Sequence, residues 1–97
     1  MNKDDMAGAL AFRTGITKKT SESIIDTVFE IITDSLVSGK KVQIVGFGSF
    51  EVKDRAPRVG RNPKANVPVN IPARRVPVFN AGKPLKDAVD NAKSPLK

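Results

Sequence analysis

KDRAPRVGRNPKANVPVNIPARR, residues 53–75, is the stretch that distinguishes this chain from an ordinary small globular domain. Seven of its 23 residues are basic and one is acidic, so its net charge is +6. It has no aromatic residue and holds four of the chain's seven prolines. Such a segment cannot form a core of its own, because nothing in it offsets the entropy lost on ordering. We therefore expect an extended arm that becomes ordered on a polyanion.

The arm has the pattern of a two-stranded ribbon. Two β-like segments, residues 51–59 and 69–76, flank the sequence GRNPKAN at residues 60–66. A glycine, an Asn-Pro pair and a second asparagine are typical of turns. Both strands of an isolated ribbon are edges, so prolines can occupy positions where an N–H would face solvent. The pattern predicts a β-ribbon whose turn spans residues 60–66.

The charge of the chain changes sign between its two halves. Residues 1–39 carry a net charge of −2, whereas residues 40–97 carry +9. This asymmetry indicates one half for folding or assembly and another for a negatively charged partner. We expect residues 1–39 to be a helical dimerisation half and the arm at residues 53–75 to bind the negatively charged partner.

Apolar residues at helical spacing predict two helices before the arm. Asn2 can cap the first helix, and Gly15 fits the left-handed position that ends it. Thr17 can cap a second helix that runs to about Ser38 and stops at Gly39. Both helices belong to the acidic half of the chain.

The second predicted helix is too apolar for contact on one side only. Eight of the 14 residues at positions 24–37 are apolar, and they form two adjoining stripes. One stripe can cover the chain's own sheet and the other can meet a second copy. A monomer with this helix at its centre is the alternative, but a core of about 60 residues is marginal without a disulfide, a metal or a partner. We therefore expect a dimer whose core includes Ile25, Val28, Phe29, Ile32, Leu36, Phe47, Phe50 and Phe79.

From Lys41 onward the apolar period changes to two, as in a strand with one buried face. Residues 42–44 and 50–52 predict a hairpin around the sequence GFG at 46–48, where glycines allow a tight turn. Residues 76–79 predict a third strand after the arm. A last helix over about 83–91 has Pro84 in its first turn, a position that tolerates proline.

This order of elements predicts one α+β domain over residues 1–91 with a three-stranded antiparallel sheet, followed by a polar tail at 92–97. The chain has neither histidine nor cysteine, so it lacks the commonest general base and the commonest soft metal ligands. No nucleotide-binding motif is complete. We expect no enzyme activity, cofactor, metal or small-molecule substrate. The sequence shows no signal peptide or membrane span, and we expect a cytoplasmic protein without a membrane partner.

Several motifs carry a resemblance to a known family. VGFGSFEV at 45–52, GRNP at 60–63, IPARRVPVF at 71–79 and AGKPLKDAV at 81–89 resemble the bacterial histone-like family of HU and integration host factor, HU above all. The resemblance implies an intertwined dimer, with itself or with a paralogue, whose helical body lies under a saddle of β-sheet. It further implies two arms that wrap double-stranded DNA in the minor groove and bend and compact it, as nucleoid-associated proteins do.

The resemblance also implies roles for single residues. Pro63 would wedge between base pairs and kink the duplex, where an ordinary turn residue is the alternative. Arg58 and Arg61 would enter or border the minor groove, beside Asn62 and Lys64 at the arm tip. Phosphates would be met by Lys53, Arg55, Arg74 and Arg75. Three lysines lie near helix N-termini: Lys3, Lys83 and Lys86. For each of them, two interpretations are equally open, a contact with a phosphate or simple exposure to solvent.

The chain departs from the family at residues 65–69, where Ala-Asn-Val-Pro-Val makes the returning strand more apolar. Two functional alternatives stay open. One is a sequence-selective DNA bender like integration host factor, which would choose sites by DNA deformability. The other is an RNA-binding basic protein, although single-strand binders usually stack bases on aromatic side chains and the arm has none.

Overall fold

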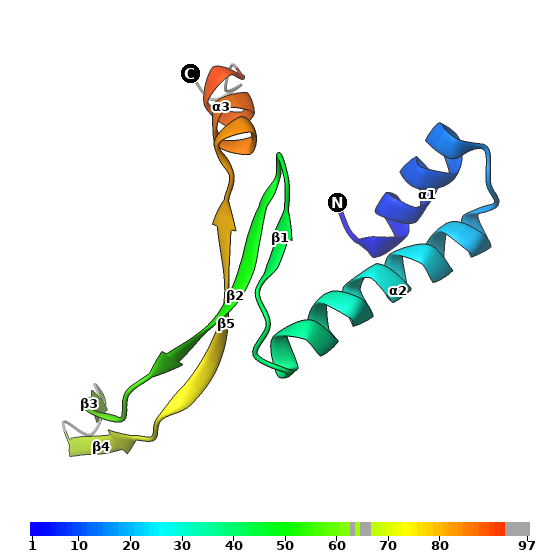
Figure 1. Cartoon of the computed structure of the whole chain (residues 1–97). Helices are drawn as coiled ribbons and strands as arrows, with labels where there is room; N and C mark the ends of the chain where they lie inside the picture. Colours follow the sequence, from blue (N-terminus) through cyan, green and yellow to red (C-terminus); the bar gives the residue numbers. More distant parts are fainter. Residues whose placement is uncertain (63, 65–66, 93–97) are drawn as a thin grey trace.

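The computed structural model describes residues 1–62, 64 and 67–92 of the 97-residue chain. Figure 1 shows two helices at one side of a curved sheet, a ribbon at one end of the sheet and a third helix at the other. The elements in chain order are α1 (Lys3–Thr14), α2 (Lys18–Val37), β1 (Val42–Ile44), β2 (Gly48–Arg55), β3 (Arg58–Asn62), β4 (Val67–Ile71), β5 (Arg74–Ala81) and α3 (Lys83–Asn91). The predicted α+β fold is confirmed.

Local capping residues set the ends of α1 and α2. The Asn2 side chain accepts a hydrogen bond from the Asp5 amide at 2.9 Å, and the Asp5 carboxylate accepts one from the Asn2 amide at 3.1 Å. This reciprocal capping box satisfies two amides that a bare helix end would leave free. Gly15 ends α1 with φ 77°, and the Thr17 hydroxyl caps α2 by accepting from the Thr20 amide at 3.1 Å. The predicted helix boundaries are confirmed.

The three-stranded sheet has the antiparallel order β1-β2-β5. Phe50 lies at the centre of the register, opposite Val42 on one side and Phe79 on the other. The centroid of the Phe79 ring lies 4.9 Å from that of the Phe50 ring and 5.5 Å from that of the Phe47 ring. Gly48 has no room for a side chain, since a Cβ there would lie 2.7 Å from the Phe79 ring and 2.6 Å from the Asn80 carbonyl oxygen.

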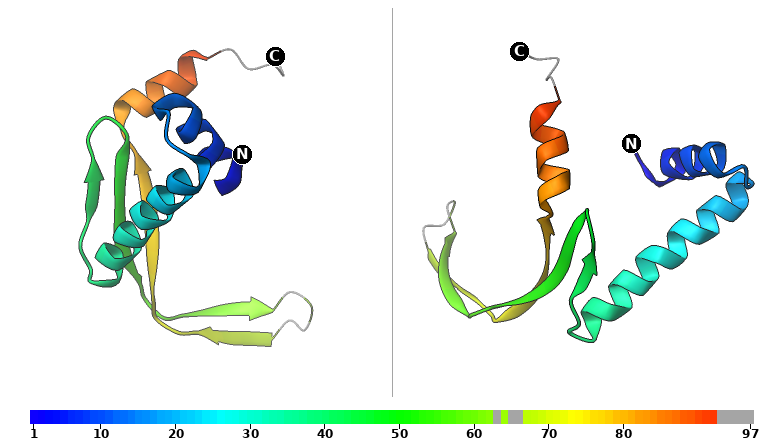
Figure 2. Two further views of the ribbon diagram at one scale, coloured as in Figure 1. Left: turned by 90° about the vertical axis from the view of Figure 1, so that its right-hand side faces the viewer. Right: turned by 45° about the horizontal axis from the view of Figure 1, so that its top comes forward.

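The arm is interrupted where it leaves the sheet. The β2–β5 pairing ends at Arg55 opposite Arg74, and the β3–β4 pairing begins at Arg58 opposite Ile71. Two residues on each side, 56–57 and 72–73, lie between the two pairings and belong to no strand. We call these four residues the elbow. Figure 2 shows the β3–β4 ribbon turned away from the sheet at this point.

The position predicted for the arm turn was partly wrong. Gly60, Arg61 and Asn62 belong to β3 and are not in a turn, because they pair with residues 67–69 of β4. Glycine suits a turn, but it also suits a close approach between strands. Here a Cβ on Gly60 would lie 2.8 Å from the Ile71 Cδ1 atom. The predicted roles of Pro63 and most of the tail fall outside the described residues.

One chain buries little apolar surface. Among the described residues, the buried apolar side chains are Ala7 and Ile25. The chain exposes 8132 Å², whereas a compact monomer of this mass would expose about 5,400 Å². Its radius of gyration is 19.0 Å, compared with about 12.5 Å for a compact domain of this length. Figure 2 shows why: α2 diverges from the sheet and α3 stands apart from both other helices.

The predicted core residues divide into two groups within one chain. Ile25 is buried, while Ile32, Leu36 and Phe50 are half-buried. The others remain open to solvent, with exposed fractions of 46% for Val28 and Phe29, 44% for Phe47 and 41% for Phe79. A single chain therefore does not close the core predicted for it.

Candidate nucleic-acid interface

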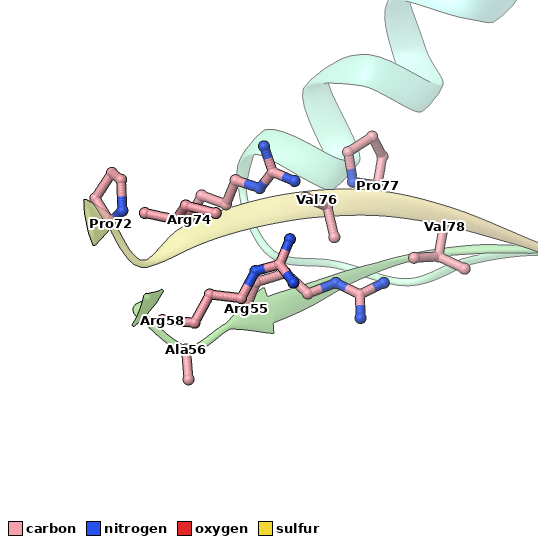
Figure 3. A pocket seen from close by; sticks show the side chains of 9 residues that line it. Arg55, Ala56, Arg58, Pro72, Arg74, Val76, Pro77 and Val78 are labelled. Atoms are coloured by element: carbon pink, nitrogen blue, oxygen red, sulfur yellow. The ribbon is translucent and has the colours of Figure 1, made fainter. Parts of the chain in front are cut away.

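Three predicted DNA-binding arginines lie together at the elbow. Arg55, Arg58 and Arg74 line a hollow of about 420 Å³. Figure 3 shows that they come from both sides of the arm and that their side chains extend in one direction, back along the sheet toward Val76 and Val78. The rest of the lining consists of Ala56, Ile71, Pro72, Val76, Pro77 and Val78. The hollow beside the elbow is thus lined by three arginines and by apolar side chains, and no carboxylate lines it.

The side chains of these three arginines are without a partner among the residues that the structure describes. In the part of the chain that the structure describes, no guanidinium group of Arg55, Arg58 or Arg74 makes a hydrogen bond or an ion pair. Arginine presents five donors in a fixed fork that matches phosphate geometry. Unpaired guanidinium groups collected at one place therefore form an anion-binding surface, and a polyanion could neutralise them without breaking existing contacts.

Arg75 has a different position from its neighbour Arg74. Its guanidinium donates to the Leu36 carbonyl oxygen at 3.2 Å and to the Val37 carbonyl oxygen at 3.4 Å. Both carbonyls lie at the C-terminal end of α2, where a helix leaves acceptors free and attracts positive charge. Arg75 thus joins β5 to α2, and the phosphate contact predicted for it stays a prediction.

Lys53 and the lysines near helix N-termini are mostly paired with acids. Lys3 lies 2.7 Å from the Asp26 carboxylate, Lys83 lies 2.9 Å from Asp87 and Lys53 lies 3.8 Å from Glu51. The hydrogen bond from Lys3 to Asp26, and then the charge of that carboxylate, raise the pKa of Lys3 above 10.5. Lys86, in the first turn of α3, is exposed. Phosphate binding by the paired lysines would have to compete with these carboxylates.

The pairing of β3 with β4 assigns the arm residues to two faces. Side chains alternate along a strand, so Arg58 lies on one face of the ribbon and Arg61 lies on the other. Lys64 is exposed in the turn beyond β3. Arg58 and Arg61 therefore cannot contact the same ligand surface in the same way, which the sequence alone did not reveal.

Sequence reasoning missed two features of the structure, one in the helical half and one in the arm. It did not predict the ion pair between Lys18 and Asp4, whose Nζ and carboxylate oxygen are 2.9 Å apart and which joins the start of α2 to α1. It also did not predict the elbow, although Pro57 and Pro72, which lack a backbone N–H, mark it on the two sides.

Metal and membrane sites find no support in the described residues. Across 1–62, 64 and 67–92, no three acidic, histidine or cysteine side chains come together as metal ligands would. Over the same residues, no helix is both long and apolar enough to cross a bilayer.

Comparison with known proteins places the chain in a family. The family model described as bacterial DNA-binding protein matches residues 1–90. The DNA-binding protein HU of Staphylococcus aureus is 54% identical over 89 residues, which cover 92% of this chain and 99% of that protein. HU of Geobacillus stearothermophilus is 49% identical over the same length and coverage.

Solved structures agree with this result. A cocrystal structure of Anabaena HU with DNA matches with a TM-score of 0.89 and 43% identity, covering 95% of this chain and all of that chain. HU from Thermotoga maritima matches with a TM-score of 0.67 and 39% identity, covering 92% of this chain and 98% of that one. The chain therefore belongs to the bacterial DNA-binding protein family.

Proposed function

We propose that this protein is an architectural DNA-binding protein that binds double-stranded DNA with little sequence preference, and bends and compacts it. The observation that carries this proposal is the group of three arginines at the elbow of a basic arm, for which the described residues supply no acidic partner. The similarity to an HU chain solved with DNA supports the same partner. Such a protein would be associated with the nucleoid in the cytoplasm.

A dimer is part of the proposal. The exposed aromatic residues Phe47 and Phe79 lie on the hairpin and the sheet, and Val28 and Phe29 lie on α2. Exposed apolar surface of this extent is typical of surfaces that another protein covers. A second copy, or a paralogue with the same fold, would cover these residues and present two arms to one duplex. Sedimentation that gave a stable folded monomer at micromolar concentration would refute this part.

The arm is proposed to act in the minor groove. A two-stranded ribbon is narrow enough for a groove, and arginine is favoured in the electronegative minor groove. Pro63 at the tip would insert as a rigid apolar wedge between base pairs. Unstacking costs a few kcal/mol per step, which the extra surface touched by bent DNA would offset. The motif GRNP, shared with the family, supports this role.

One experiment tests the function and its rivals together. Affinity is measured by fluorescence anisotropy for several unrelated DNA duplexes and for an RNA duplex, each over a series of salt concentrations. Mainly electrostatic binding predicts similar affinities for the DNA duplexes and a steep fall with salt. A spread above about 10³ among DNA sequences would instead support a sequence-selective bender. A strong preference for RNA would refute the proposal.

A further inference from the structure

The last residue pair before the elbow joins like charges. Arg55 and Arg74 lie directly opposite each other in the β2–β5 pairing, whereas the adjacent pair joins Asp54 to Arg75. Cross-strand neighbours of opposite charge stabilise a sheet, and like charges directly opposite destabilise it. The sheet therefore ends, on the elbow side, in a pair that weakens its own strand pairing.

No carboxylate among the described residues pairs with either arginine. A third arginine, Arg58, reaches the same hollow from the other side of the elbow (Figure 3). The lining has no carboxylate, and the described residues give these arginines no ion pair. All three arginines are exposed, so solvent and salt screen part of the repulsion between them.

The elbow also lacks the contacts that hold the rest of the arm. The four elbow residues belong to no strand, and two of them, Pro57 and Pro72, have no N–H to donate. No strand pairing fixes the direction of the ribbon relative to the sheet at this point. Charges placed on both sides of the elbow can therefore influence that direction.

We propose that a backbone phosphate of bound DNA occupies the elbow hollow and is shared by Arg55, Arg58 and Arg74. The single negative charge of the phosphate lies between the Arg55–Arg74 pair and Arg58 across the elbow, and it offsets part of their mutual repulsion. DNA binding thus relieves a repulsion that the free protein carries, and it fixes the direction of the arm at the same time. This inference rests on the proposed function. It adds to that function a specific phosphate site and a repulsion between arginines in the free protein.

The test is the variant Arg74→Gln, which removes one of the opposed charges and keeps a long polar side chain. Its two expected effects have opposite signs. In the free protein, hydrogen exchange of backbone amides at the elbow end of β2 and β5 slows by up to about fivefold, because the like-charge pair is gone. With a DNA duplex, affinity falls, and the slope of log K against log salt decreases by at most about 1 for each elbow engaged, because Arg55 and Arg58 still contact the phosphate.

Two further variants serve as controls. Arg74→Lys keeps the positive charge and should retain most of the salt slope of the wild type. Arg13→Gln removes an exposed arginine from the last turn of α1, in the helical half, and should change neither elbow exchange nor the salt slope. Together they separate the charge at position 74 from a general loss of positive charge.

Each outcome decides a separate claim. Unchanged affinity together with an unchanged salt slope in Arg74→Gln, with normal binding by the wild type, would overturn the phosphate site and leave the proposed function intact. Faster exchange at the elbow in Arg74→Gln would overturn the repulsion. Failure of the wild type to bind duplex DNA would overturn the proposed function itself.

Discussion

Replacing Arg75 with glutamine tests whether this arginine holds the fold together or contacts DNA. Its guanidinium donates to the Leu36 and Val37 carbonyl oxygens at 3.2–3.4 Å, at the C-terminal end of α2. It also faces Asp54 across the β2–β5 pairing. The variant removes the hydrogen bonds from the guanidinium to these carbonyls. The Leu36 carbonyl keeps the Gly39 amide as a donor at 2.9 Å, and the Val37 carbonyl is left to water.

The expected loss follows from the geometry. A cation at a helix C-terminus contributes about 0.3–1 kcal/mol, and a hydrogen bond to a charged group contributes about 1.5–3 kcal/mol when it is short and protected. These bonds are long and exposed, so we expect a loss of about 1 kcal/mol. For a domain of this size that corresponds to a fall in Tm of about 4–8 °C.

The assay is thermal unfolding followed by circular dichroism at fixed protein concentration, together with the salt dependence of duplex binding. We expect Arg75→Gln to unfold at lower temperature and to keep the salt slope of the wild type. Arg74→Gln, one residue away, is the matched variant with the reverse result. If Arg75→Gln unfolds like the wild type and its salt slope falls by about 1, Arg75 contacts phosphate and the assignment to α2 is refuted.

Three other changes have defined outcomes. Gly48→Ala should cost about 1–3 kcal/mol in chemical denaturation, because its Cβ would overlap the Phe79 ring; unchanged stability would contradict this packing. Pro63→Ala should keep much of the DNA affinity but lose bending in a fluorescence or circularisation assay, and full bending would refute the wedge. The raised pKa of Lys3 means that its ion pair with Asp26 stabilises the fold below pH 10.5 and is lost as pH rises further. Lys3→Gln should therefore lower Tm at pH 8 and have less effect above the raised pKa.

The helices could be predicted from the sequence because their end signals are local. Asn2, Gly15 and Thr17 lie within the first or last turn that they cap, so nothing distant decides their conformation. The strand pattern at residues 42–52 was equally readable, since one buried face gives an alternation of period two. The last helix was placed with the same bounds by its proline and its apolar spacing.

The arm was harder because its structure depends on pairing across a long separation in the sequence. Gly60 was assigned to a turn, although the side chain of Ile71 on the opposite strand explains why glycine is needed there. Arg74 and Arg75 are adjacent and chemically identical, so the same role, a phosphate contact, was predicted for both. Their opposite orientations on β5 send one to the elbow and the other to α2, and only the register reveals this.

The small buried core of a single chain has a consequence for how the protein is made. If a second copy covers the exposed aromatic residues, folding and association become one bimolecular event, and the folded fraction rises with the concentration of chains. Newly synthesised chains at low abundance would then remain open to proteolysis until they meet a partner. The amount of functional protein would rise more steeply than the amount of chain synthesised, which gives expression level a direct influence on DNA compaction.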